Sequence, residues 1–159
     1  MRDRDPEGRP RSARPRDAFG RPLPYGSPGV PRVPDDYAPT TEQALADGRG
    51  FLSEGMPFNA HEVFEGRWKC APDDERDLWQ GLAQICVGLT HLQRGNGRGA
   101  VTLFSRGAAK AQAYGGAYDA VGKAASNLSH DSDPDDAIAL ILEKLPSEGV
   151  PSSGGAAGA

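Results

Sequence analysis

The sequence predicts an all-α fold, a single bundle of four to six helices with disordered tails at both ends. Between Leu78 and Leu92 the apolar residues recur at steps of three and four, which places them on one face of a long helix. No stretch shows the apolar and polar alternation of a half-buried strand. The 14 Pro and 21 Gly among 159 residues exceed what a compact helical core accommodates, so part of the chain is expected outside it. We therefore place one helical domain at residues 38–146.

The first two helices are predicted from their end signals. Thr40 followed by Gln43 forms a capping-box pattern, and the helix that it starts is expected to end at Gly55. Pro57 suits the first turn of a second helix, because proline needs no backbone partner there. This second helix is expected to run to about Cys70.

The remaining elements follow from spacing and from helix breakers. The longest helix is expected to start at Asp73 and to break in the Gly-rich stretch 95–99, before a helix rich in Ala and Gly that runs from about residue 98 to residue 114. Around residues 118–128 the spacing is helical but glycines flank it, which predicts a short or frayed element. Asp133 before a proline opens the last helix.

Both ends of the chain are predicted to be disordered. The first 40 residues contain nine Pro and eight Arg and almost no aliphatic side chains, so they bury too little apolar surface to offset the entropy of ordering. Residues 147–159 are mostly Gly, Ser and Ala, a flexible composition. The predicted division is a tail at 1–37, the helical domain at 38–146 and a second tail at 147–159.

The charge of the predicted domain argues against nucleic-acid binding. Residues 41–145 carry 15 acidic residues against 10 Lys and Arg, a net charge of −5. Nucleic-acid binding needs a basic surface to neutralise phosphates, so only the Arg-bearing tail is left as a weak phosphate contact.

The sequence also predicts a cytoplasmic protein with no membrane span. The N-terminus has no apolar run of the kind that a signal peptide needs, and the apolar stretch at 81–89 is too short to cross a bilayer. Cys70 and Cys86 do not form a Cys-x-x-Cys pair, and both are expected to be reduced thiols.

One stretch, FNAHEVFEGRWKC at 58–70, concentrates titratable and aromatic side chains. His61, Glu65 and Trp68 are four and three residues apart, so they share one face of the second helix, while Glu62 points to the side. These side chains are the candidate site of the chain.

The third helix is expected to supply the rest of this site. A short connection folds it back antiparallel to the second helix, and levels then pair where residue numbers sum to about 144. Gln80 and Gln84 therefore fall near Glu65 and His61. His91 lies about 12 Å farther along the axis, where it is expected to line the same groove.

These residues resemble a known family. The motif H-x-x-x-E-x-x-W, carried here by His61, Glu65 and Trp68, and the later stretch ERDLWQGLAQICVGLTHLQRGNGRGA are similar to the bacterial and archaeal domain of unknown function 309 family. The resemblance covers about residues 45–114. It implies an all-helical bundle and a bacterial type of protein, and it implies no reaction.

A divalent metal site is one reading of the cluster. His61 and Glu65, an imidazole and a carboxylate one helical turn apart, are suitable ligands. Two ligands do not complete a site, and the chain has only three His and no second Glu-x-x-His element. Gln80 or Gln84 would be a weak third ligand.

Acid–base chemistry is a second reading. Glu65 would orient the imidazole of His61 and raise its basicity, beside a pocket lined by Gln80, Gln84 and His91. No nucleophile with a neighbouring base is evident in the sequence, and the stretch GNGRG follows a helix rather than a strand, unlike a phosphate-binding loop.

A structural role is the favoured reading of the cluster. A His, a Glu and two Gln can satisfy one another in a buried hydrogen-bond network that fixes the register of two helices. In a simpler version Gln80, Gln84 and His91 lie on a solvated face with Arg76 and Asp77.

The function expected from the sequence is that of a helical domain that binds a small ligand or a protein partner. The groove for it lies beside His61, Glu65, Gln84 and His91. The alternative is a metal-dependent or acid–base hydrolase that uses His61, Glu62 and Glu65, and the absence of a complete catalytic set favours a protein that is not an enzyme.

Overall fold

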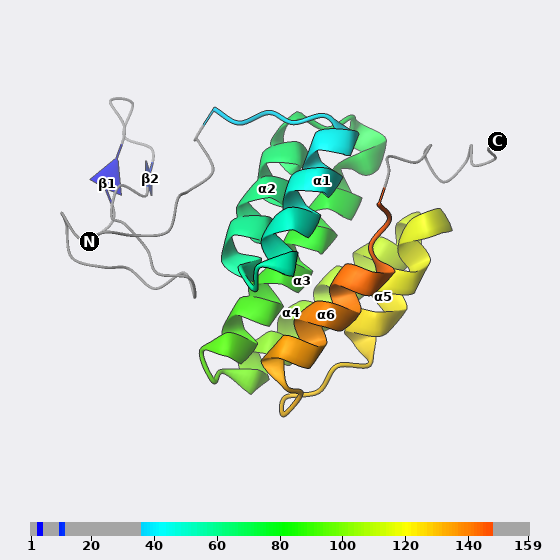
Figure 1. Cartoon of the computed structure of the whole chain (residues 1–159). Coiled ribbons are helices and arrows are strands. Elements are labelled where there is room, and N and C mark those ends of the chain that lie inside the picture. The colour runs from blue at the N-terminus through cyan, green and yellow to red at the C-terminus, as the bar shows by residue number, and fades with distance from the viewer. Residues whose placement is uncertain (1–2, 5–9, 12–35, 148–159) are drawn as a thin grey trace.

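The computed structural model describes residues 3–4, 10–11 and 36–147 of the chain (Figure 1). In this part of the chain there are six α-helices and two short 3₁₀ helices: α1 (Thr41–Ser53), α2 (Pro57–Cys70), η1 (Asp73–Glu75), α3 (Arg76–Gln93), α4 (Gly97–Tyr114), η2 (Gly116–Tyr118), α5 (Asp119–Ser126) and α6 (Pro134–Lys144). The predicted all-α bundle is confirmed.

Outside the helical domain, two short segments form a minimal strand pair. β1 (Asp3–Arg4) and β2 (Pro10–Arg11) pair antiparallel, with Asp3 opposite Arg11. A ladder of two residues is too short to produce a recognisable alternation in the sequence. The other residues of the two tails predicted to be disordered, 1–37 and 147–159, lie largely outside the described residues, so that prediction stays open. Tyr37, at the predicted boundary, packs against the core.

The predicted helix ends are present as specific contacts. The hydroxyl of Thr40 accepts from the backbone N–H of Gln43 at 3.2 Å, and the side chain of Gln43 accepts in return from the N–H of Thr40 at 2.9 Å. Asp133 caps α6 by accepting from the N–H of Asp136 at 3.0 Å. The third helix differs from the prediction in its first turn, because residues 73–75 form η1 and the α-helix begins at Arg76. Tightening of the first turn into a 3₁₀ helix is common at helix ends.

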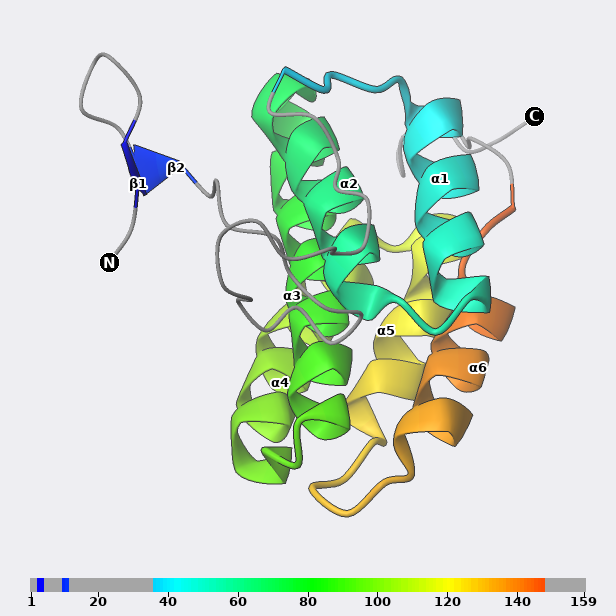
Figure 2. The same cartoon turned by 60° about the vertical axis from the view of Figure 1, so that its left-hand side comes forward.

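Consecutive helices pack side by side around one core (Figures 1 and 2). α3 lies between α2 and α4 and contacts both, while α6 closes the bundle against α1 and α5. The largest buried side chains come from α2, α3, α4 and the α4–α5 connection: Phe64, Trp79, Phe104 and Tyr118. α3 is therefore the central helix, buried on two sides.

The contact between α3 and α4 is close because glycines meet across it. A Cβ atom added to Gly107 would lie 2.5 Å from the carbonyl oxygen of Gly81, and one added to Gly81 would lie 3.0 Å from the carbonyl oxygen of Gly107. The fourth helix was predicted to be rich in Ala and Gly, and such small residues permit close approach of two helices. The contact fixes α3 firmly on its α4 side.

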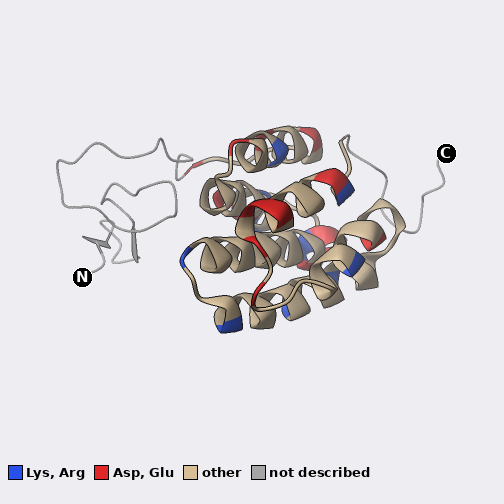
Figure 3. Cartoon of the chain, turned by 60° about the horizontal axis from the view of Figure 1, so that its bottom comes forward, with Lys and Arg blue, Asp and Glu red and all other residues tan. Residues whose placement is uncertain are grey.

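Charge is distributed unevenly over the helices (Figure 3). α4 carries Arg98, Arg106 and Lys110 and no acidic residue, whereas η1 and the start of α3 carry four acidic residues between 73 and 77. Among the helices that the structure describes, none combines the length and the apolar character that crossing a membrane requires.

Candidate functional site

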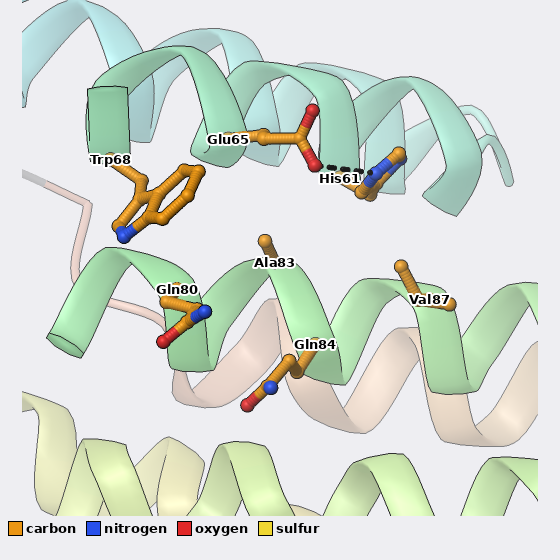
Figure 4. Close-up of a pocket in the computed structure, with 7 residues that line it drawn as sticks. All are labelled: His61, Glu65, Trp68, Gln80, Ala83, Gln84 and Val87. Carbon is orange, nitrogen blue, oxygen red and sulfur yellow. Dashed lines mark ion pairs between the residues drawn. The ribbon is translucent and has the colours of Figure 1, made fainter. Parts of the chain in front are cut away.

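A cavity of about 190 Å³ lies between α2 and α3 (Figure 4). Its lining comes from one face of each helix: His61, Glu65 and Trp68 from α2, and Gln80, Ala83, Gln84 and Val87 from α3. The antiparallel register expected from the sequence pairs His61 with Ala83, and the structure places both of these residues on this cavity. Five of the seven candidate residues are thus brought together.

The amphipathic pattern of α2 explains why its polar residues face the cavity. Ala60, Val63 and Phe64 are fully buried on the side that faces the core. Because His61 and Glu65 follow these positions by one residue, they lie on the neighbouring face of the helix, about 100° away. The core of the bundle therefore sets the direction in which the candidate site points.

His61 is held by two contacts. Its Nδ1 lies 3.0 Å from the carbonyl oxygen of Phe58, and its Nε2 lies 3.4 Å from Oε2 of Glu65. Since a carbonyl oxygen only accepts, Nδ1 carries the proton of that hydrogen bond. The atom that faces the carboxylate is therefore Nε2, and the contact is a full ion pair when Nε2 is protonated too.

Glu65 is an ionised carboxylate at the border of the cavity. The hydrogen bond from His61 lowers the pKa of Glu65 below its usual range, the positive charges of His61 and Lys69 act in the same direction, and partial burial opposes them. The side chain of Glu65 is 44% exposed, against 16% for His61. The carboxylate can thus reach both the cavity and the solvent.

The two glutamines line the cavity without joining the pair. In Figure 4 the side chains of Ala83 and Val87 point toward α2, while the amide groups of Gln80 and Gln84 lie away from His61 and Glu65. Within residues 36–147, no hydrogen bond connects either amide to the pair, and Oε1 of Gln84 is buried without a partner.

The expected four-membered hydrogen-bond network is therefore wrong. The register was right, but it brings Ala83 itself to the level of His61. The glutamines three residues before and one residue after Ala83 fall to the side.

Glu62 and His91 do not line this cavity. His91, near the end of α3, accepts at Nδ1 from the side-chain amide of Asn96 at 3.1 Å, and that amide is oriented because its oxygen caps the N–H of Gly99. Burial lowers the pKa of His91, and the nearby charge of Arg94 lowers it further. His91 therefore lies outside the lining of this cavity, and Asn96 holds it at the α3–α4 turn.

The cavity is poorly suited to metal binding or to covalent catalysis. Among the residues described by the structure, no three His, Cys, Asp or Glu side chains lie close enough to hold a metal ion. His61 and Glu65 supply two ligands, and the lining contains no Ser, Thr or Cys to act as a nucleophile.

A second polar cluster was not foreseen from the sequence. Oε1 of Glu75 accepts from the indole N–H of Trp79 at 3.1 Å and lies 3.4 Å from a guanidinium nitrogen of Arg67. The guanidinium also lies 5.8 Å from the centre of the Trp79 ring. The four-residue spacing between Glu75 and Trp79 was the available signal. This cluster ties the end of α2 to the start of α3, beside the cavity.

Comparison with protein families gives one match. The model of the family described as Domain of unknown function (DUF309) matches residues 45–103. This segment contains all of α2 and α3, and therefore every residue that lines the cavity. Neither the curated proteins nor the solved structures gave a match to the chain.

Proposed function

We propose that the α2–α3 cavity binds a small ligand. The description of the DUF309 family model, which matches residues 45–103, assigns no activity, so the proposal is drawn from geometry. One observation carries the proposal. An ionised carboxylate, paired with an imidazole, borders a cavity whose other walls include the apolar side chains of Trp68, Ala83 and Val87. Apolar walls with a few polar groups are typical of small-molecule sites.

The volume of the cavity limits the size of the ligand. An apolar cavity of about 150 Å³ accommodates benzene, so a cavity of about 190 Å³ suits a ligand with one ring or a short chain. Most sites for drug-sized ligands and cofactors are larger, at about 300–1,000 Å³. The proposal therefore concerns a small molecule.

Binding is favoured over hydrolysis. A hydrolase that used His61, Glu62 and Glu65 would need a nucleophile or an activated water. Among the described residues, the cavity lining offers neither a group of three metal-ligating side chains nor a Ser, Thr or Cys nucleophile. Glu62 does not line the cavity. We also propose that the protein acts in the cytoplasm. Its two cysteines are free, with Cys70 exposed, and exposed free thiols are typical of a reducing compartment.

The test uses the two tryptophans of the chain. Trp68 lines the cavity, while Trp79 is buried in the core and serves as an internal reference. The indole N–H signals are followed by ¹⁵N–¹H NMR while a set of one-ring compounds of positive, neutral and negative charge is added. Binding is expected to shift the signal of Trp68 and to leave that of Trp79 nearly unchanged.

A cavity-filling variant completes the experiment. The side chain of Ala83 points toward α2, so Ala83→Leu is expected to fill the space and abolish the shift while the helical circular dichroism is retained. The proposal is wrong if no compound of any charge shifts Trp68, or if the shifts persist in Ala83→Leu.

A further inference from the structure

We propose that the ligand of this cavity is a small organic cation, a primary ammonium attached to a ring-sized or short apolar body. The inference rests on the proposed function and specifies the chemical class of the ligand. Three features support it: the charge of the lining, the kind of polar atoms that lack a donor, and the shape of the apolar wall.

The charge of the lining favours a cation. Glu65 is the only ionised acid among the seven lining residues, and neither Lys nor Arg is among them. Lys69 acts on the charge of Glu65 from outside the lining, and Arg76 lies 5.4 Å from the centre of the Trp68 ring, also outside it. An anion in the cavity would be repelled by Glu65, and a neutral ligand would leave the carboxylate without a new partner.

The polar atoms around the cavity require hydrogen-bond donors. Nδ1 of His61 donates to the carbonyl of Phe58, so Nε2, which lies 3.4 Å from Oε2 of Glu65, is a second acceptor when it carries no proton. Two acceptors at this separation are both within reach of one ammonium group, which has three N–H donors. An ammonium would replace the proton that otherwise links His61 to Glu65.

The apolar wall sets the body of the ligand. Trp68 closes one end of the cavity, and Ala83 and Val87 form its floor on α3 (Figure 4). A benzyl group fits the volume of about 190 Å³ and leaves its substituent close to the Glu65 carboxylate. Benzylamine is therefore a suitable probe, and benzyl alcohol and benzoate match its shape with a neutral and a negative group.

The experiment compares these three compounds by titration against the full-length protein, with the Trp68 indole signal as the readout. Benzylamine is expected to bind at least about tenfold more tightly than benzyl alcohol or benzoate, as a charge-assisted hydrogen bond provides. Glu65→Gln should abolish this preference. Glu143→Gln removes the same charge from an exposed position on α6 that does not line the cavity, and should leave the preference intact.

The outcomes separate the two proposals. If benzyl alcohol or benzoate binds as tightly as benzylamine, the cation inference is overturned while the cavity remains a ligand site. It is also overturned if Glu65→Gln keeps the preference for benzylamine. If none of the three compounds shifts Trp68 and the wider set of one-ring compounds also fails, the proposed function falls with it.

A last arm distinguishes a free amine from a lysine side chain of a protein partner. The titration is repeated with n-butylamine and with the peptide Gly-Gly-Lys-Gly-Gly, which carry the same alkylammonium. Binding of n-butylamine at least as tight as that of the peptide supports a small-molecule ligand. Binding of the peptide that is tenfold tighter assigns the cation to a polypeptide and overturns the small-molecule inference.

Discussion

The close approach of α3 and α4 predicts opposite effects for the same substitution at two helical glycines. Alanine stabilises a helix interior by about 1 kcal/mol relative to glycine. At Gly107 the added methyl would lie 2.5 Å from the carbonyl oxygen of Gly81 and 2.6 Å from a side-chain carbon of Ile85, so the helices must separate by several tenths of an ångström. Overpacking of a core costs up to about 3 kcal/mol. After the gain of about 1 kcal/mol in helix preference, Gly107→Ala is expected to lower the free energy of unfolding by about 2 kcal/mol.

Gly50→Ala is the matched control. Gly50 lies in α1, and a Cβ added there meets no atom within 4 Å. Only the helical preference then acts, and stability should rise by about 0.5 to 1 kcal/mol. Urea unfolding followed by circular dichroism at 222 nm measures both variants, with the slope of the transition checked for a change in the unfolded state. A Gly107→Ala protein as stable as the wild type would refute the close helix contact.

Three further predictions concern polar contacts. Glu65→Gln should lower stability by only about 0.5 kcal/mol or less at neutral pH, because the side chain is 44% exposed. The pKa of Glu65 in the folded protein lies below its ordinary value of 4.5, so the stability that ionised Glu65 contributes is present above pH 4.5 and is lost as the pH falls through the folded pKa. The melting temperatures of wild type and variant should therefore converge on acidification. A difference that stays constant with pH would contradict the His61–Glu65 ion pair. Glu75→Ala should lower the free energy of unfolding in urea by about 1 to 3 kcal/mol, because Arg67 and the indole N–H of Trp79 lose the acceptor that they share. The control Asp74→Ala, at an exposed neighbouring position, should lower it by less than about 0.5 kcal/mol. Arg49→Met removes two hydrogen bonds of 2.8 Å to the carbonyl oxygens of Leu142 and Leu145. The variant should lower the free energy of unfolding by about 2 kcal/mol and speed amide hydrogen exchange at the end of α6. Unchanged exchange there would show that Arg49 does not hold the end of α6.

The helices were predictable because their signals are local. The capping box at Thr40, the proline at residue 57 and the Asp133 cap each depend on residues within one turn, and all three appear in the structure. The seam of α3 was equally visible, since Leu82, Ile85 and Leu89 are buried together. Local chemistry therefore gave nearly the whole order of helices.

The site was predictable at the level of the helix pair and not at the level of atoms. The short connection after α2 fixed the antiparallel register, which brought Gln80 and Gln84 to the same cavity as His61. Whether these side chains touch depends on the rotation of α3 about its own axis, and the number of residues in the connection does not determine this rotation. The choice between Ala83 and the glutamines as the group facing His61 therefore needed coordinates.

Contacts between distant segments account for most of what the sequence did not reveal. Arg49 donates to carbonyl groups that lie 93 and 96 residues later in the chain. No local pattern around Arg49 or at the end of α6 predicts this contact. Glu75 was similarly overlooked, because an acid in the first turn of a helix usually serves the helix dipole. Its role as acceptor for both Arg67 and Trp79 appears only when α2 and α3 are packed.

The unequal packing of the two sides of α3 explains why a cavity is found where it is. On the α4 side, glycine meets glycine and leaves no room for a methyl group. On the α2 side, the small Ala83 faces His61 across a space that no larger residue of the lining fills. A movement of α3 toward α2 that closed this space would separate α3 from α4 and lose their close contact at Gly81 and Gly107. A larger residue at position 83 would bury more apolar surface between α2 and α3. With alanine there this apolar contact is missing, and a bound ligand would provide it.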